Sequence, residues 1–201
     1  MCRPHGKKLY RSALLLFAGN LYIFLYSISY TGILIVTAYL MLILYFDIRK
    51  KQVWPEKAAA LLLFAFCVVF PIAGPFLLKG KAFQFFNRLL STRFELVYNN
   101  FSQNKVTLFG TYIPPNPEVN LSLDSSFAYM LMFYGIIAFV LCGGLYAFSI
   151  YYCMSHNRLQ ETAILLGTAI AGITEQFLYN LSFKNLTFFI MGYVLYAGLL
   201  K

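Results

Sequence analysis

The sequence predicts an all-α integral membrane protein: a bundle of about six transmembrane helices, with one long extracytoplasmic loop that contains a short amphipathic helix. Of the 201 residues, 60% are hydrophobic and only 11% are charged, whereas soluble domains carry about 25% charged residues. The mean hydropathy is +0.68. Several apolar runs approach the roughly 20 residues that a membrane span needs. Together these observations exclude an ordinary soluble domain.

The expected spans follow one another along a single domain that covers residues 1–201. They occupy residues 13–27, 31–46, 58–78, 127–153, 162–178 and 186–200, and the loop 79–126 separates the third from the fourth. The first two spans are short and are joined by a polar step, so one long bent element is an alternative for that pair. Pro71, Gly74 and Pro75 interrupt the third span and are expected to kink its outer end, because proline frees backbone groups.

The positions of the lysines and arginines predict how this bundle is oriented in the membrane. Lysines and arginines cluster in the tail before the first span and in the turn after the second, and Arg158 lies in the turn after the fourth. With six spans these positions share one side, which the positive-inside rule makes cytoplasmic. Both termini are then cytoplasmic and the loop 79–126 lies outside. The net charge of +9 is explained by topology, so no nucleic-acid partner is expected.

The outer loop is the only long polar stretch of the chain. Residues 87–100 carry apolar side chains at helical spacing, which predicts an amphipathic helix on the membrane surface. Arg88 and Arg93 lie within it, and their guanidinium groups match phosphate oxygens. Simple anchoring to lipid headgroups is the alternative for both. The Pro-Pro-Asn-Pro run at 114–117 predicts an exposed or lid-like segment.

Two carboxylates complete the candidate site. Asp124 precedes the fourth span, where it suits either an N-cap or a group that binds or deprotonates a hydroxyl. Glu175 lies near the outer end of the fifth span, and ionisable groups within spans usually face a partner or a cavity. On the outer side Glu175 can meet Arg93 or Arg88, either as a structural ion pair or as part of a binding or catalytic site.

Motifs for several other chemistries are missing from the sequence. It contains no H-E-x-x-H, no G-x-S-x-G, no P-loop and no glycine-rich nucleotide fingerprint. The four cysteines form no C-x-x-C pair, so neither a metal site nor a disulfide framework is expected. The sequence therefore implies no metal and no cofactor. A transferase of this kind would use an activated donor that is already in the membrane.

Five segments carry a family resemblance, in order along the chain. Residues 27–32 resemble a Ser-Arg-Thr-Gly step with Tyr30 in place of arginine, and residues 87–93 resemble an Asn-x-Leu-Leu-Ser-Gly-Arg stretch. Residues 108–110 match a Leu-Phe-Gly turn, and residues 123–127 with 134–137 resemble an Asp-x-Ser-Tyr and Tyr-Gly-Ile segment. The last segment is Ile173-Thr174-Glu175, which with Asn180 and Asn185 resembles a closing set of Glu and Asn positions. This pattern resembles the C-terminal half of Wzy-type polysaccharide polymerases. Such polymerases usually have more spans, so the chain is expected to be the C-terminal part of a larger protein.

The resemblance implies a glycosyltransferase at the outer face of the bacterial cytoplasmic membrane. It would transfer a growing glycan from undecaprenyl pyrophosphate to a sugar hydroxyl of the next lipid-linked repeat unit, making capsule, exopolysaccharide or O-antigen. Arg93, and secondarily Arg88, would stabilise the leaving pyrophosphate. Asp124 or Glu175 would position or deprotonate the acceptor hydroxyl.

The resemblance also implies further contacts and partners. Asn87, Gly110, Ser125 and Ser126 lie in the matching segments and are expected to bind substrate. The expected partners are the lipid-linked glycan, membrane lipids, a flippase and a chain-length regulator. The alternatives are half of a transporter or flippase, which an interrupted third span would suit, a scaffolding membrane subunit, and an O-antigen-ligase-like transferase that shares the donor.

Overall fold

The computed structural model describes residues 7–27, 30–48, 54–112, 123–176, 178 and 186–199. All regular structure in these ranges is helical, which confirms the predicted helical fold for them. The helices are α1 Lys7–Ser27, α2 Tyr30–Ile48, α3 Trp54–Leu77, α4 Gly80–Leu89, α5 Arg93–Gln103, α6 Ser126–Tyr129, the π-helical turn η1 Met130–Tyr134, α7 Gly135–Ser155, α8 Leu159–Ala171 and α9 Leu186–Leu199. The predicted features at residues 28–29, 114–117, Asn180 and Asn185 lie outside the described residues.

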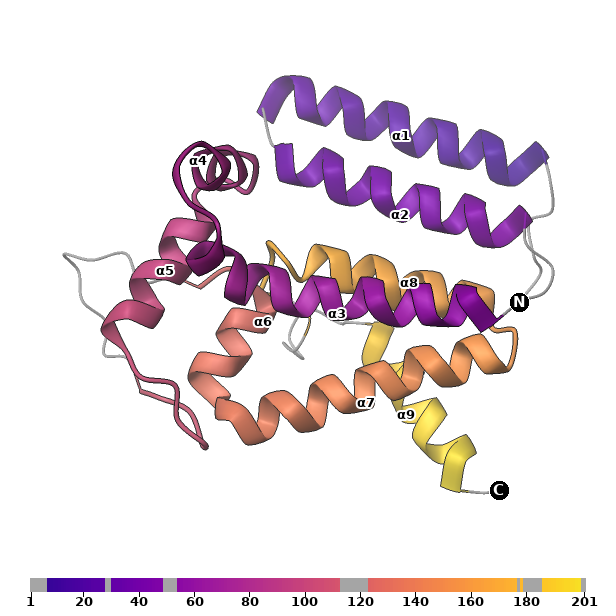
Figure 1. Cartoon of the computed structure of the whole chain (residues 1–201). Coiled ribbons are helices and arrows are strands. Elements are labelled where there is room, and N and C mark those ends of the chain that lie inside the picture. The colour runs from indigo at the N-terminus through magenta and orange to yellow at the C-terminus, as the bar shows by residue number, and fades with distance from the viewer. Residues whose placement is uncertain are drawn as a thin grey trace.

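The long helices pack in layers (Figure 1). Helices α3, α7 and α8 contact one another in the middle of the molecule, α2 packs on α8, and α1 packs on α2. Helices α1 and α2 run side by side in opposite directions, so they are a helical pair and not one long bent element. Helices α4, α5 and α6 gather at the end of the molecule where α3 ends and α7 begins. That end holds the candidate site.

Among the residues that the structure describes, two segments are long and apolar enough to cross a membrane. They are Trp54–Leu77 and the helical stretch Ser126–Ser155, with hydropathies of 2.4 and 2.1. Only 33% and 17% of their most apolar windows are buried inside the fold, whereas the core helix of a soluble protein would be mostly buried. An outward apolar surface of this size suits a lipid environment. Length, composition and exposure thus support membrane association.

The interior lies where α3, α7 and α8 meet. The ring of Phe64 stacks on that of Tyr146 with centroids 5.0 Å apart. The hydroxyl of Tyr146 donates a hydrogen bond of 2.7 Å to the carbonyl of Leu165, so this buried polar group is satisfied. On the other face of α8, a Cβ at Gly167 would lie 2.1 Å from the Tyr39 ring of α2. The glycine therefore lets α2 approach α8 closely.

Helix α3 continues through its two prolines. Pro71 and Pro75 are buried inside the helix, which runs on to Leu77, so the third span is not broken at its prolines. A Cβ at Gly74 would lie 2.9 Å from the ring of Phe94, which is only 1% exposed. The first turn of α5 thus packs on the Pro-x-x-Gly-Pro stretch of α3. That contact fixes the position of Arg93, the neighbour of Phe94.

The predicted helix over residues 87–100 is broken in two. Helix α4 ends at Leu89 and α5 begins at Arg93. Between them Ser91 and Thr92 adopt left-handed backbone angles, with φ of +52° and +66°. Neither residue favours this region, and a β-branched residue there is a rare outlier. The helical periodicity of the side chains gave no sign of the break, because it lies in two polar residues at the surface.

The helical stretch that starts at Ser126 is also interrupted. Residues Met130–Tyr134 form a π-helical turn, and Gly135 follows with φ +85° and ψ +177°. This conformation is essentially restricted to glycine. Figure 1 shows the chain bending sharply between α6 and α7 at this point. The fourth predicted span, 127–153, is thus a short helix and a long one at an angle, with α7 alone covering 21 residues.

The loop at residues 107–108 supplies hydrogen-bond acceptors to the amino end of α7. The N–H groups of Ile136 and Ile137 donate to the carbonyls of Thr107 and Leu108, at 3.1 and 3.2 Å. The first N–H groups of a helix have no partner within the helix itself. In a membrane such groups must still be satisfied by the protein. The loop therefore acts as a backbone cap for α7.

Candidate functional site

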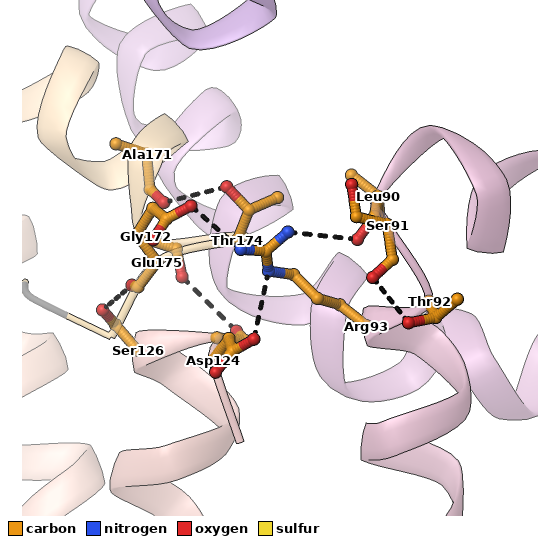
Figure 2. A network of polar contacts seen from close by, with 11 residues as sticks. Leu90, Ser91, Thr92, Arg93, Asp124, Ser126, Ala171, Gly172, Thr174 and Glu175 are labelled. Atoms are coloured by element: carbon orange, nitrogen blue, oxygen red, sulfur yellow. Dashed lines mark hydrogen bonds and ion pairs between the residues drawn. The ribbon is translucent and has the colours of Figure 1, made fainter. Parts of the chain in front are cut away.

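Arg93 lies between two carboxylates from distant parts of the chain (Figure 2). Its Nη2 lies 3.0 Å from Oε1 of Glu175, and its Nε lies 3.7 Å from Oδ2 of Asp124. Its Nη1 donates a hydrogen bond of 3.4 Å to the carbonyl of Leu90. The predicted contact of Glu175 with Arg93 is confirmed. We refer to Arg93, Asp124 and Glu175 as the triad.

The triad combines an enclosed cation with accessible anions. The side chain of Arg93 is 16% exposed, whereas those of Asp124 and Glu175 are each 43% exposed. Arg93 is the first residue of α5, where the helix dipole disfavours a cation. The two carboxylates offset that cost. Because they are also the more exposed members, they are the groups that a ligand would meet first.

Serines after Asp124 hold the triad together. The N–H of Ser126 and the hydroxyl of Ser125 both donate to the carbonyl of Gly172, at 2.9 and 3.3 Å. The hydroxyl of Ser126 donates to the backbone carbonyl of Glu175. Both serines are buried. They join the start of α6 to the turn after α8, and so set the separation of the two carboxylates.

Asp124 does not cap a helix. The N-cap position of α6 is Ser125, and no side chain makes a capping hydrogen bond there. The capping alternative for Asp124 is therefore wrong. Its carboxylate instead faces the guanidinium of Arg93. Ser125 and Ser126, which follow it, make the connection to the α8 turn.

Asn87 and Arg88 lie one helix away from the triad. The Oδ1 of Asn87 accepts a hydrogen bond of 3.1 Å from the N–H of Glu95, and its Nδ2 donates one of 3.3 Å to Oε2 of Glu95. This reciprocal pair resembles a capping box and satisfies an N–H in the first turn of α5. Arg88 is exposed on α4. Asn87 thus fixes where α5 begins, and with it the position of Arg93.

Gly110 belongs to the α7 cap. It has φ of +93°, and a Cβ there would lie 2.0 Å from the carbonyl oxygen of Phe133. A Cβ at Gly135 would lie 2.3 Å from the N of Gly110. The two glycines therefore let two stretches of backbone touch. The structure brings Gly110 against the bend between α6 and α7, and its contacts are with that bend and not with the triad.

Burial raises the pKa of Glu175, which lies in the turn beyond the end of α8. The charge of Arg93 lowers this pKa and that of Asp124 raises it, and the balance is a raised value. The desolvation of the carboxylate thus outweighs its ion pair. With both carboxylates ionised the triad carries one net negative charge. Protonation of Glu175 makes it neutral.

The raised pKa predicts a pH-dependent stability. An acid whose folded-state pKa is raised stabilises the fold below its ordinary value of 4.5, and this contribution is lost as the pH rises through the folded-state pKa. We expect the thermal midpoint in detergent to fall as the pH rises across that window. Glu175→Gln cannot ionise and should flatten this part of the profile. An unchanged slope in the variant would assign the pH dependence to other groups.

Thr92 is a residue of the site region that the side-chain pattern did not single out. It directly precedes Arg93 and holds a left-handed conformation. In the Asn-x-Leu-Leu-Ser-Gly-Arg stretch that residues 87–93 were expected to resemble, this position is glycine. Glycine adopts such angles without a Cβ penalty.

Replacing Thr92 with glycine is therefore expected to stabilise the protein by about 1 kcal/mol. Thermal unfolding in detergent, followed by circular dichroism, measures the change. The matched control is Ser102→Gly, also exposed but inside α5, which should lose roughly 0.5–1 kcal/mol. A loss at Thr92 as large as that at Ser102 would mean that the left-handed turn is not formed.

The chain matches no protein-family model, no curated protein and no solved structure. Within the described ranges, no group of three or more His, Cys, Asp or Glu side chains is placed to hold a metal ion. The function therefore has to be argued from the triad and its surroundings.

Proposed function

We propose that this chain is a membrane-embedded glycosyltransferase that polymerises undecaprenyl-pyrophosphate-linked oligosaccharide repeat units. The observation that carries the proposal is Arg93 between Asp124 and Glu175, since it places a phosphate-binding cation beside two candidate proton acceptors. The three residues come from three of the five segments that carry the resemblance to Wzy-type polymerases. Glycan transfer requires both kinds of group within one site.

The reaction balances with these groups alone. The bond between the anomeric carbon and the pyrophosphate oxygen breaks, and the acceptor hydroxyl oxygen forms a new bond to that carbon. The hydroxyl proton passes to a carboxylate, and the undecaprenyl pyrophosphate leaves with the bonding electrons. Glu175 is favoured as the proton acceptor, because burial raises its pKa and so makes its carboxylate a stronger base than an ordinary glutamate. Asp124 would then orient the acceptor sugar.

Arg93 retains donors for the leaving group. Its Nη1 and Nη2 each carry two N–H bonds, and one on each is directed at Leu90 or Glu175. The remaining pair is available to oxygens of the pyrophosphate as negative charge develops there.

A six-span topology accommodates this site. Helix α7 has 21 residues, about 32 Å at 1.5 Å per residue, which matches a hydrocarbon core of about 30 Å. The shorter helices α8 and α9 would need local thinning of the bilayer. The triad and the turn that contains Arg158 lie at opposite ends of α8. The triad end would face outward from the bacterial cytoplasmic membrane, and the Arg158 end would face the cytoplasm.

The transporter alternative loses its main support. It rested on an interruption of the third span, and α3 instead runs unbroken through Pro71 and Pro75. The left-handed turn at Thr92 favours the polymerase, because the resembling family has a glycine there. Partner proteins such as a flippase and a chain-length regulator remain part of the proposal.

The direct test is reconstitution. The chain is inserted into liposomes with lipid-linked repeat units extracted from the source strain. The expected products are glycans of two or more repeats together with free undecaprenyl pyrophosphate, resolved by gel electrophoresis and thin-layer chromatography. Liposomes with Glu175→Gln should make far less of both, while Glu161→Gln, a carboxylate of similar exposure at the other end of α8, should remain active. Single repeats alone, from protein with native helix content, would refute the polymerase.

A further inference from the structure

Helix α4 crosses the end of α3 steeply. It begins at Gly80, immediately after α3 ends at Leu77. Figure 1 views α4 along its axis, while α3 lies across the view. Helix α3 is one of the two segments long and apolar enough to cross a membrane. A helix that crosses its end at this angle lies in the plane of the membrane surface.

One face of α4 is fixed to the protein by aromatic rings. The ring of Phe86 lies 5.3 Å from that of Phe70 on α3 and 6.3 Å from that of Phe94 on α5. Phe83 lies 6.3 Å from Phe94. These contacts determine how α4 is rotated about its axis. They also leave the opposite face without any of these rings.

The opposite face combines an apolar ring with cations. Phe85 is 62% exposed. Lys81 lies four positions before it and Arg88 three positions after it, so all three share one face, and both cations are exposed. Helix α4 contains no carboxylate, so this face is purely cationic. Long basic side chains on each side of an aromatic ring suit the boundary between headgroups and acyl chains.

A series of ring contacts joins this face to an exposed apolar surface of α3. Phe66 is 54% exposed and stacks on Phe70 with centroids 4.9 Å apart, and the ring of Phe86 lies 5.3 Å from those of both Phe70 and Phe85. The apolar side of α3 therefore leads through these rings to Phe85 and its flanking cations. A polypeptide partner at this place would also have to cover the apolar surface of α3. Lipid can cover the α4 face and that apolar surface together.

We propose that the face formed by Lys81, Phe85 and Arg88 is a docking surface for anionic phospholipid. The ring of Phe85 inserts between acyl chains, and the two cations bind headgroup phosphates. This inference rests on the placement of α4 and is independent of the proposed glycan transfer. It assigns α4 the task of holding the site end of the molecule at a fixed depth in the membrane.

The test places a single fluorescent reporter on this face. Trp54 is the only tryptophan, so Phe85→Trp in a Trp54→Phe background reports from this face alone. The full chain is reconstituted into phosphatidylcholine vesicles that contain a small fraction of brominated phosphatidylglycerol or brominated phosphatidylcholine. Iodide added outside measures exposure to water. Ser102→Trp in the same background is the control, since Ser102 is exposed on the polar helix α5.

The reporter at position 85 should emit at short wavelength, be quenched by brominated lipid and be shielded from iodide. Brominated phosphatidylglycerol should quench it more strongly than brominated phosphatidylcholine. Lys81→Gln with Arg88→Gln should remove that preference, with the relative association constant falling roughly fivefold for each cation. Iodide quenching equal to that of the Ser102 control would overturn the proposal. So would an unchanged lipid preference in the double variant.

Discussion

Arg93→Ala in the chromosomal copy is expected to collapse long surface polysaccharide to single repeats on the lipid carrier. The substitution removes the guanidinium that contacts both Asp124 and Glu175. It leaves two partly enclosed carboxylates facing each other without a cation. It also removes the donors proposed for the leaving pyrophosphate, and the loss of such donors costs roughly 100-fold or more in rate.

The measurement is a glycan length profile of the strain, with the variant protein quantified in its membrane fraction. Arg93→Lys should restore only part of the polymer, because an ammonium group cannot bridge two carboxylates and a carbonyl as the planar guanidinium does. Lys105→Ala is the matched control, since it removes an exposed cation from the same connecting region and should leave the profile unchanged. A normal profile for Arg93→Ala, with the protein present in the membrane, would exclude the phosphate role.

Gly135→Ala is expected to destabilise the protein by about 3 kcal/mol or more. The new Cβ would lie 2.3 Å from the N of Gly110 and 2.4 Å from the carbonyl oxygen of Leu108. Both neighbours are backbone atoms and cannot rotate away. The φ of +85° with ψ of +177° adds strain for any residue other than glycine. Relief requires the loop to leave α7, which exposes the N–H groups of Ile136 and Ile137.

Denaturant or thermal unfolding of the purified protein in detergent measures this loss. Gly144→Ala provides the control within the same helix, because a Cβ at Gly144 meets nothing within 4 Å. That variant should be neutral or gain roughly 0.5–1 kcal/mol from the better helix propensity of alanine. If the two variants unfold alike, the loop does not cap α7.

The sequence predicted the helices better than their interruptions. Apolar composition and length are properties of whole segments, so the predicted spans 31–46, 58–78 and 186–200 overlap α2, α3 and α9 closely. The breaks at Thr92 and Gly135 depend on single backbone conformations. Thr92 carries no propensity for its angles. Gly135 lies in an apolar run where glycine is commonly tolerated within a helix.

Part of the site could be predicted for a simple electrostatic reason. A carboxylate near the end of a span needs a partner, and the predicted partners of Glu175 were Arg93 and Arg88 in the outer loop; the structure pairs it with Arg93. The roles of Asn87 and Gly110 did not follow. Both residue types bind ligands and also build turns, and only the structure shows Asn87 on the first turn of α5 and Gly110 against the Phe133 carbonyl.

The separation of the triad along the chain bears on how the protein is made. Arg93 and Glu175 are 82 positions apart. During synthesis Arg93 and Asp124 are available together, while the carboxylate of Glu175 emerges only after α7 and α8. The site of a growing chain therefore cannot close until α1 to α8 have been synthesised. Any activity that depends on the triad is delayed until most of the bundle around it exists.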